Sequence, residues 1–174
     1  LGVSLTKGFG RLQAIENAQA KLTGLGHDGN TVASIMQDAT AAVKGTAFGL
    51  DEAASASAAA VAAGVQPGEE LQSVLRLMGD AATIAGTDFT SMATIFNKVK
   101  ASGKLQGDEI LQLSEAGIPI LQLLANELGV TTEEVSKMAS KGEIDFETFR
   151  AAMEAGMGGA ALKSGETLQG AFAN

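Results

Sequence analysis

Helical periodicity interrupted by glycine runs along almost the whole chain, and it restricts the fold more than any other feature of the sequence. In the first segment, residues 5–22, large apolar residues recur at the spacing of one helix face; they are Leu5, Phe9, Leu12, Ile15 and Leu22. The glycines that end successive segments are Gly24, Gly45, Gly64, Gly86, Gly117, Gly129, Gly142 and Gly156. No strand hairpin and no fixed-period repeat stands out. The pattern predicts an all-α fold, a compact multi-helix bundle of about eight to nine helices with short Gly-rich turns, and it allows a long leading helix.

Side chains that accept hydrogen bonds from free backbone N–H groups precede several of these segments. The predicted N-cap residues are Asp28 or Asn30, Asp88, Thr131 (in a capping box with Glu134) and Asp145. Pro67 is predicted to be the first residue of its helix, and Pro119 to lie in a first turn, because a missing N–H costs nothing there. These signals agree with the glycine pattern.

The core must be built from small and medium-sized apolar side chains, because Trp, Tyr and Cys are all absent. Apolar residues make up 45% of the chain, which is enough for a buried core and argues against disorder. Alanine buries little area per residue, so the Ala-rich segment 53–63 is expected to pack by close approach of helices. The lack of cysteine excludes disulfides and thiolate metal sites.

The charge balance disfavours two classes of partner. The net charge is −8, whereas binding to nucleic acid and to anionic membrane surfaces depends on Lys and Arg. No stretch reaches the roughly 18 apolar residues that a membrane span requires. We therefore expect this segment to bind no nucleic acid and to make no membrane contact.

Acidic residues occur in four neighbouring pairs, which raises the question of a hydrolytic site. The pairs are Asp51-Glu52, Glu69-Glu70, Asp108-Glu109 and Glu133-Glu134. A glycosidase holds two carboxylates across a cleft, with separated pKa values. Each of these pairs instead falls in the predicted first turn of a helix, where the helix dipole favours negative charge. We interpret them as helix-start residues and predict no catalytic residue.

His27, the single histidine, lies in a glycine-rich loop. Without cysteine or a second histidine, a zinc site would need three carboxylates or a second chain, so we interpret His27 as a solvated loop residue. Gly24, Gly26 and Gly29 match G-x-G-x-x-G, but a predicted helix precedes them where a dinucleotide-binding fold has a strand. In residues 158–164, Leu162 replaces the glycine that a phosphate loop needs before its lysine. No cofactor-binding residue and no metal ligand is predicted.

Two further segments have competing interpretations. Residues 128–135 are similar to the turn and second helix of a helix-turn-helix, but Glu133 and Glu134 occupy positions where a DNA reader carries basic or amide side chains. A helical corner is expected there, and DNA reading is the less favoured alternative. For the Ala-rich segment, packing within the domain is favoured over a helix–helix contact with another copy or with the rest of a long coiled protein.

The segment from Lys104 to Leu121, KLQGDEILQLSEAGIPIL, resembles the most characteristic part of the N-terminal domain family of phage tail tape-measure proteins. The family pattern is approximately G-[KR]-L-x-G-[DE]-E, then Q-L-x-E-A-G-[IV]-P-[IV]-L, and Leu128-Gly129-Val130 continues the match. Residues 11–15 and 45–52 are similar to the family's opening helix and to its Thr-x-Phe segment. Near the end of the chain the sequence departs from the pattern, since Leu168 stands where the family often has Trp.

The resemblance implies a structural and assembly module of a phage or prophage tail tape-measure protein, not an enzyme, that supports tail-length determination through protein–protein contacts. The implied partners are other tape-measure copies, tail-tube proteins and tail-assembly proteins. The implied location is the lumen of the virion tail tube, after assembly in the bacterial cytoplasm. The alternatives are a segment associated with a cell-wall hydrolase and, less favoured, a helix-turn-helix DNA-binding regulator.

We expect the chain to be a piece of a longer protein with three parts. Residues 1–29 would form a leading helix that connects to the rest of the parent protein, residues 30–160 a compact helical domain, and residues 161–174 a Gly-containing exit segment. The surfaces expected to meet partners are the exposed acidic helix starts, such as Glu69-Glu70, and the Ala-rich helix.

Overall fold

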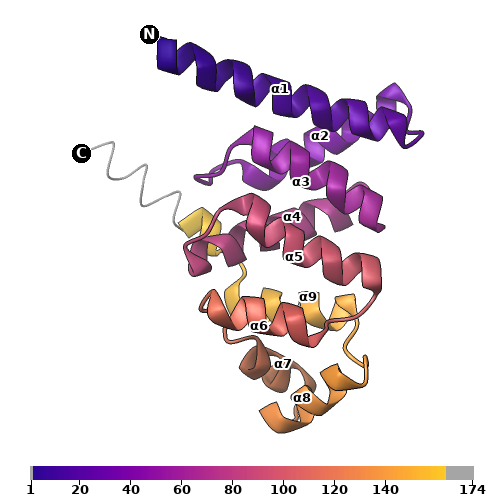
Figure 1. Cartoon of the computed structure of the whole chain (residues 1–174), viewed down its shortest axis with the longest axis vertical. Helices are drawn as coiled ribbons and strands as arrows, with labels where there is room; N and C mark the ends of the chain where they lie inside the picture. The colour runs from indigo at the N-terminus through magenta and orange to yellow at the C-terminus, as the bar shows by residue number, and fades with distance from the viewer. Residues whose placement is uncertain (1, 164–174) are drawn as a thin grey trace.

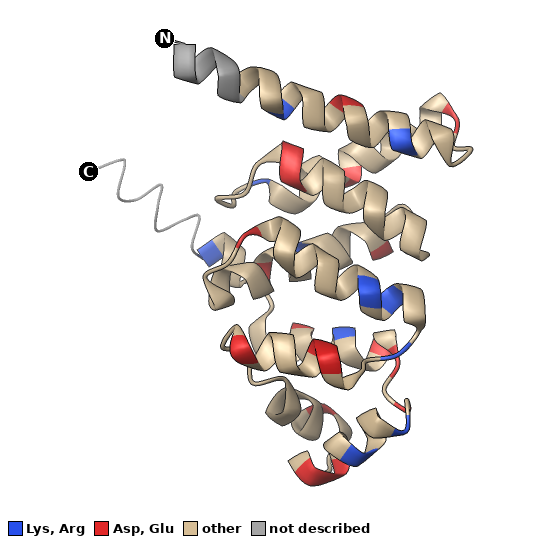
Figure 2. Cartoon of the chain, in the orientation of Figure 1, with Lys and Arg blue, Asp and Glu red and all other residues tan. Residues whose placement is uncertain are grey.

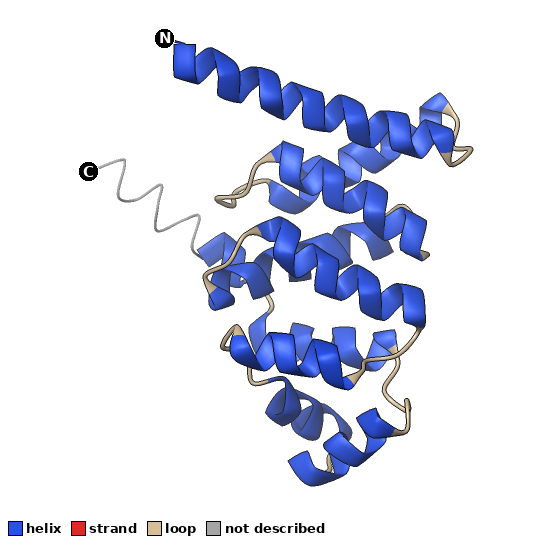
Figure 3. Ribbon diagram, viewed as in Figure 1, coloured by secondary structure: helices blue, strands red, loops and turns tan. Residues whose placement is uncertain are grey.

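The computed structural model describes residues 2–163 of the chain, with side chains from residue 8 onward. This part contains nine α-helices and no strand (Figure 1 and Figure 3), which confirms the all-α prediction. The helices are α1 (Gly2–Gly24), α2 (Gly29–Val43), α3 (Leu50–Ala63), α4 (Glu69–Ala85), α5 (Phe89–Ser102), α6 (Gly107–Glu115), α7 (Ile120–Leu128), α8 (Thr132–Ser140) and α9 (Phe146–Met157).

The helices are stacked in layers along the long axis of the molecule (Figure 1). At one end α1 lies across α3, α2 packs beside α3, and α4 packs beside α5 in the next layer. The two layers are joined because α2 contacts α4 and α3 contacts α5. From the far end α9 returns to pack against both α7 and α4, so the last helix links the α6–α8 end to the first five helices.

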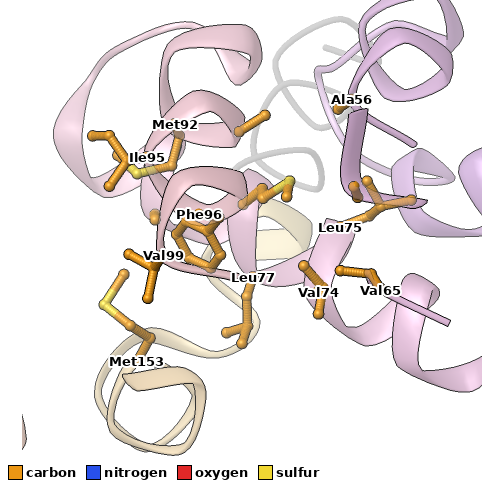
Figure 4. Packing of buried hydrophobic residues seen from close by; sticks show 14 of the residues in the cluster. Ala56, Val65, Val74, Leu75, Leu77, Met92, Ile95, Phe96, Val99 and Met153 are labelled. Atoms are coloured by element: carbon orange, nitrogen blue, oxygen red, sulfur yellow. The ribbon is translucent and has the colours of Figure 1, made fainter. Parts of the chain in front are cut away.

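One apolar core connects these layers. Figure 4 shows Phe96 and Val99 of α5 close to Leu77 of α4 and Met153 of α9, and all four side chains are fully buried. The ring of Phe96 meets that of Phe149 edge to face, with centroids 5.0 Å apart. Removing these side chains from water is the main force that holds α9 on the α4–α5 layer.

A second aromatic pair packs against a glycine in the middle of α4. Phe48 and Phe89 lie edge to face, with centroids 5.2 Å apart. A Cβ atom at Gly79 would lie 3.4 Å from the ring of Phe89 and 3.5 Å from that of Phe48. The two rings therefore rest almost directly against the backbone of α4.

Most of the predicted helix caps are confirmed. The carboxylates of Asp28, Asp88 and Asp145 accept the third backbone N–H of their helices, from Thr31 at 2.7 Å, Ser91 at 2.6 Å and Thr148 at 2.8 Å. The backbone N–H bonds from Thr31 and Ser91 hold the pKa of Asp28 and of Asp88 below the usual range. The side chain of Thr148, and then its backbone N–H, lower the pKa of Asp145. Thr131 Oγ1 accepts the N–H of Glu134 at 3.2 Å.

The predicted positions of both prolines need correction. Pro67 lies in the turn before α4, which begins at Glu69. The reason is Gly68, whose φ of 107° is left-handed and whose N–H donates to Asp38 at 2.9 Å, so that the helix starts only after this turn. Pro119 directly precedes α7 as its N-cap residue, with φ −78°.

The predicted apolar face of the first helix is only partly buried. Leu22 is fully buried and Ile15 half-buried, but Phe9 is 70% exposed and Leu12 54% exposed. The physical reason is that α1 packs mainly on α3, so only the side of α1 that faces α3 is covered. The side chain of Leu5 lies outside the described residues.

Candidate interaction surfaces

The four acidic pairs lie in the first turns of α3, α4, α6 and α8, as the sequence predicted. In three of them the second acid turns back to accept a backbone N–H: Glu52 from Gly49 at 3.3 Å, Glu70 from Gln66 at 3.0 Å, and Glu109 from Gln106 at 3.0 Å. These carboxylates close the starts of their helices, which is a structural use of the charge.

The expectation that the acidic helix starts are exposed is wrong for Glu109 and holds only in part for Asp51, Glu52 and Glu70, which are half-buried. Glu109 is fully buried, and its Oε1 has no hydrogen-bond partner and lies 4.0 Å from Nζ of Lys98. Glu70 is half-buried and pairs with Lys100 at 3.3 Å.

The acids that remain exposed are the first members of the pairs in α4 and α6 and both acids at the start of α8. Glu69, Asp108, Glu133 and Glu134 are exposed. Figure 2 shows that acidic and basic positions are dispersed over all the layers rather than gathered on one face. A partner that binds these acids would therefore contact individual helix starts and not one continuous acidic surface.

His27 lies half-buried in the loop between α1 and α2. The glycines around it lie where two helices meet, as predicted: Gly24 ends α1, Gly29 begins α2, and Gly26 adopts a left-handed φ of 99° in the turn between them. Within residues 2–163 the structure brings no three His, Cys, Asp or Glu side chains together in a way that could hold a metal ion. Of the segment 158–164, Ser164 lies outside the described residues.

The helical corner predicted at residues 128–135 is present. Gly129, with φ 69°, ends α7, and Thr131 caps α8. Glu133 and Glu134 follow in the exposed first turn of α8 and present carboxylates at the position where a DNA reader would meet phosphate. The corner thus has the shape of a helix-turn-helix, but the carboxylates of its second helix repel DNA.

The most characteristic sequence block, residues 112–121, forms the corner between α6 and α7. Leu113, Ile118 and Ile120 are fully buried, and the N–H of Ile118 donates to the carbonyl of Leu113 at 2.9 Å across the turn at Gly117. Leu111, directly before this block, is 58% exposed. The block specifies how two helices meet, and this explains its lack of chemically reactive side chains.

The Ala-rich helix α3 is used mainly for packing within the chain. It contacts α1, α2, α4 and α5, and the buried residues of its surface are Ala53, Ala54, Ala56, Ser57, Ala58 and Ala60. Its free side forms an apolar groove of about 360 Å³ with α5, lined by small side chains that include Ser55, Ala59, Thr90 and Thr94. This groove is the part of α3 that remains open to a partner.

Two buried aspartates in helix interiors were missed by the sequence reasoning. Asp38 of α2 accepts the N–H of Gly68 and a side-chain N–H of Gln72, both at 2.9 Å. Asp80 of α4 accepts the N–H groups of Gly159 and Ala161, both at 2.9 Å. Each carboxylate satisfies backbone groups of a turn far away in the sequence. The available signal was the poor helix propensity of aspartate outside a first turn.

A cavity of about 370 Å³ lies between α2, α4 and the residues that follow α9. Phe48, Gly79 and Phe89 contribute its apolar wall, and Lys44 and Arg76 contribute cationic side chains. Glu154 also lines it. Asp80 lines it as well, so the cavity combines apolar area with two positive and two negative charges.

Comparison with known proteins identifies one similarity. A protein-family model described as "Tape measure protein" matches residues 6–174. No curated protein and no solved structure matches the chain. Among the described residues, none of the helices has the length and hydropathy needed to cross a membrane.

Proposed function

The chain belongs to the tape measure protein family, a family of structural phage tail proteins, and from this premise we propose that it is a docking module that supports tail assembly and tail-length determination. The observation that carries the proposal is the family match, which covers residues 6–174. The partners proposed are other tape-measure copies, tail-tube proteins and tail-assembly proteins. The proposed location is the lumen of the tail tube, after assembly in the bacterial cytoplasm.

The division into a leading helix (1–29), a compact domain (30–160) and an exit segment (161–174) is part of this proposal. The length-setting region would lie elsewhere in a longer parent protein, and this module would hold its position through protein–protein contacts. Two surfaces support such a role: the groove between α3 and α5, and the exposed acids of the helix starts. Except for Asn97 and Lys98, the side chains that line the groove are small, which suits close approach of a partner helix.

The role of the α3–α5 groove in binding a partner is tested by placing a large side chain in it. Thr94→Arg places a long charged side chain on the groove wall, and Gln112→Arg places the same side chain at an exposed position of α6 outside it. Phage carrying Thr94→Arg are expected to yield far fewer complete tails in electron micrographs, and phage carrying Gln112→Arg a normal number. Circular dichroism of both purified chains controls for folding. Normal tails with Thr94→Arg would remove the groove from the proposal.

The acidic surface is tested by charge reversal at Glu69, which is exposed, with Glu69→Gln as the neutral control. If Glu69 meets a cationic partner, Glu69→Lys lowers the yield of complete tails more than Glu69→Gln does, and added salt during in vitro assembly reduces the wild-type yield as well. Equal yields for the three proteins would show that this helix start is not an interface.

The length-setting role of the parent protein is tested separately. An in-frame deletion in its long helical region, outside residues 1–174, is expected to shorten tails in proportion to the residues removed. Tails of unchanged length would refute this role. The hydrolase alternative is checked by incubating the 174-residue chain with peptidoglycan, where release of soluble fragments would count against a purely structural module.

A further inference from the structure

The cavity between α2 and α4 lies where the described chain leaves the domain. Gly159, Ala161 and Leu162 line it directly, and they belong to the turn after α9 and the residues that follow it. Leu162 is 48% exposed at this position, and its side chain reaches Gly45, where a Cβ atom would lie 3.3 Å away. The chain therefore reaches the mouth of the cavity immediately before residue 164.

Asp80 fixes this approach. Its side chain is on α4, only 5% of the residue is exposed, and its two oxygens accept the N–H groups of Gly159 and Ala161 at 2.9 Å each. Charge-assisted hydrogen bonds of this length are among the stronger ones in proteins. The carboxylate thus holds the backbone against the cavity, and the start of the next segment is set by the domain itself.

We propose that this cavity is the docking site of residues 164–174 of the same chain, through the side chains of Leu168 and Phe172. These are the two large apolar residues of the segment, and their separation of four residues is the spacing at which a helix presents two side chains on one face. The aromatic wall formed by Phe48 and Phe89 offers them an apolar surface.

The reach of the chain agrees with this occupant. Leu168 is six residues beyond Leu162, and six residues of extended backbone span up to about 20 Å. Glu166 is the single charged residue in positions 164–174. The cavity carries Lys44 and Arg76 beside two acids, Asp80 and Glu154, and Asp80 is already bound to the N–H groups of Gly159 and Ala161. Docking would set the direction in which the chain leaves the module. The docking proposal does not depend on the proposed role in the tail.

Cross-linking tests the proposal directly, because the chain has no cysteine of its own. Ala41 lines the cavity and Gln169 lies between the two docking residues, so Ala41→Cys with Gln169→Cys is expected to form an intramolecular cross-link with a short bismaleimide. The control pair joins Gln169→Cys to Thr94→Cys in the α3–α5 groove, and should react much less. Equal yields for both pairs would overturn the proposal.

A second pair of variants tests the side chains. Adding Leu168→Ser and Phe172→Ser is expected to lower the 41–169 cross-linking rate about tenfold, the change that corresponds to about 1.4 kcal/mol. Adding Thr167→Ser and Ala173→Ser, which leave both apolar residues in place, is expected to leave the rate unchanged. An equal rate in all three proteins would contradict docking through Leu168 and Phe172.

Mixing isotopically labelled and unlabelled chains distinguishes the source of the segment. Cross-links within one chain support the proposal. Cross-links between labelled and unlabelled chains would overturn it in favour of a segment exchanged between copies. A pairing of Glu166 with Arg76 is tested by Arg76→Glu, which should lower the rate, and by its combination with Glu166→Lys, which should restore it; a failure to restore it would remove this ion pair from the docking contact.

Discussion

The contacts around α3 and the contact between α5 and α9 are both buried, yet they are built from opposite kinds of side chain. Around α3, alanines with almost no exposed surface lie against α1, α2 and α5. Between α5 and α9 the ring of Phe96 packs against that of Phe149. Small side chains contribute little area each and depend on the helices lying close together, whereas large side chains contribute area directly. The two regions should therefore fail in different ways when their side chains are changed in size.

The largest effect is expected from a deletion in the aromatic region. Phe149→Ala removes a fully buried ring that contacts Phe96 and Phe146, and should lower the free energy of unfolding by about 3–5 kcal/mol. Urea denaturation measures the change. Phe149→Leu keeps most of the volume and should cost clearly less. A loss below about 1 kcal/mol for Phe149→Ala would show that this contact does not hold α9 in place.

The Ala-rich region should respond instead to added volume. Ala54 has no exposed surface, so Ala54→Leu must push α3 away from its neighbours and should cost about 1–3 kcal/mol. Its exposed neighbour Ser55 is the control, and Ser55→Leu should change the free energy of unfolding by no more than about 0.5 kcal/mol. Equal costs for the two substitutions would mean that α3 is not closely packed.

A substitution at Gly79 should change the free energy of unfolding less than Phe149→Ala or Ala54→Leu does. A Cβ atom there would meet Phe89 and Phe48 at 3.4–3.5 Å, which is ordinary van der Waals contact. Gly79→Ala should therefore stabilise the protein by about 0.5–1 kcal/mol, because glycine costs backbone entropy in a helix interior. Gly79→Val, which adds two more methyl groups against the rings, should destabilise it. Thermal unfolding separates the two outcomes, and a destabilising alanine would show that the rings already fill the space.

The smallest effect is expected at a helix cap outside both packed regions. The pKa of Asp145 is lowered in the folded protein, so this group stabilises the fold above the ordinary carboxyl pKa and loses that contribution as the pH falls through the folded pKa. Asp145→Asn keeps an acceptor for Thr148 but cannot titrate. The free energy of unfolding of Asp145→Asn, measured by urea titration, should therefore fall less than that of the wild type between about pH 7 and about pH 2.

A neutral cap is the control for that experiment. Thr131→Ala removes the acceptor for the N–H of Glu134 and should cost about 1 kcal/mol at every pH, because no titrating group is lost. If Asp145→Asn followed the wild-type pH profile throughout, the titration of Asp145 would have no part in the acid sensitivity of the fold.

The local signals of the sequence were reliable where the deciding interaction lies within a few residues. Asp28, Asp88, Thr131 and Asp145 cap the helices that they were expected to cap, because a cap hydrogen bond joins residues three apart. The corner at residues 112–121 was recognised for the same reason. Pro67 was misplaced because its turn is held by Asp38, about thirty residues away in the sequence.

The candidate surfaces were predicted less completely. The sequence identified Glu69-Glu70 and the Ala-rich helix, but it could not tell that Glu109 is buried while Asp108 is exposed. Nor could it show that Phe9 and Leu12 lie outside the face of α1 that α3 covers. Exposure depends on which neighbouring helix lies against each face, and helical periodicity carries no information about that neighbour.

The sequence by itself determined the all-α class, most helix starts and stops and the family, because these follow from periodicity, caps, glycines and a characteristic block of residues. The tertiary structure alone decided that Asp38 and Asp80 hold distant turns, that α9 returns to α4, and that the exit of the chain borders a cavity. Those features join residues about 30 to 80 positions apart. Only the packing of complete helices brings such residues together.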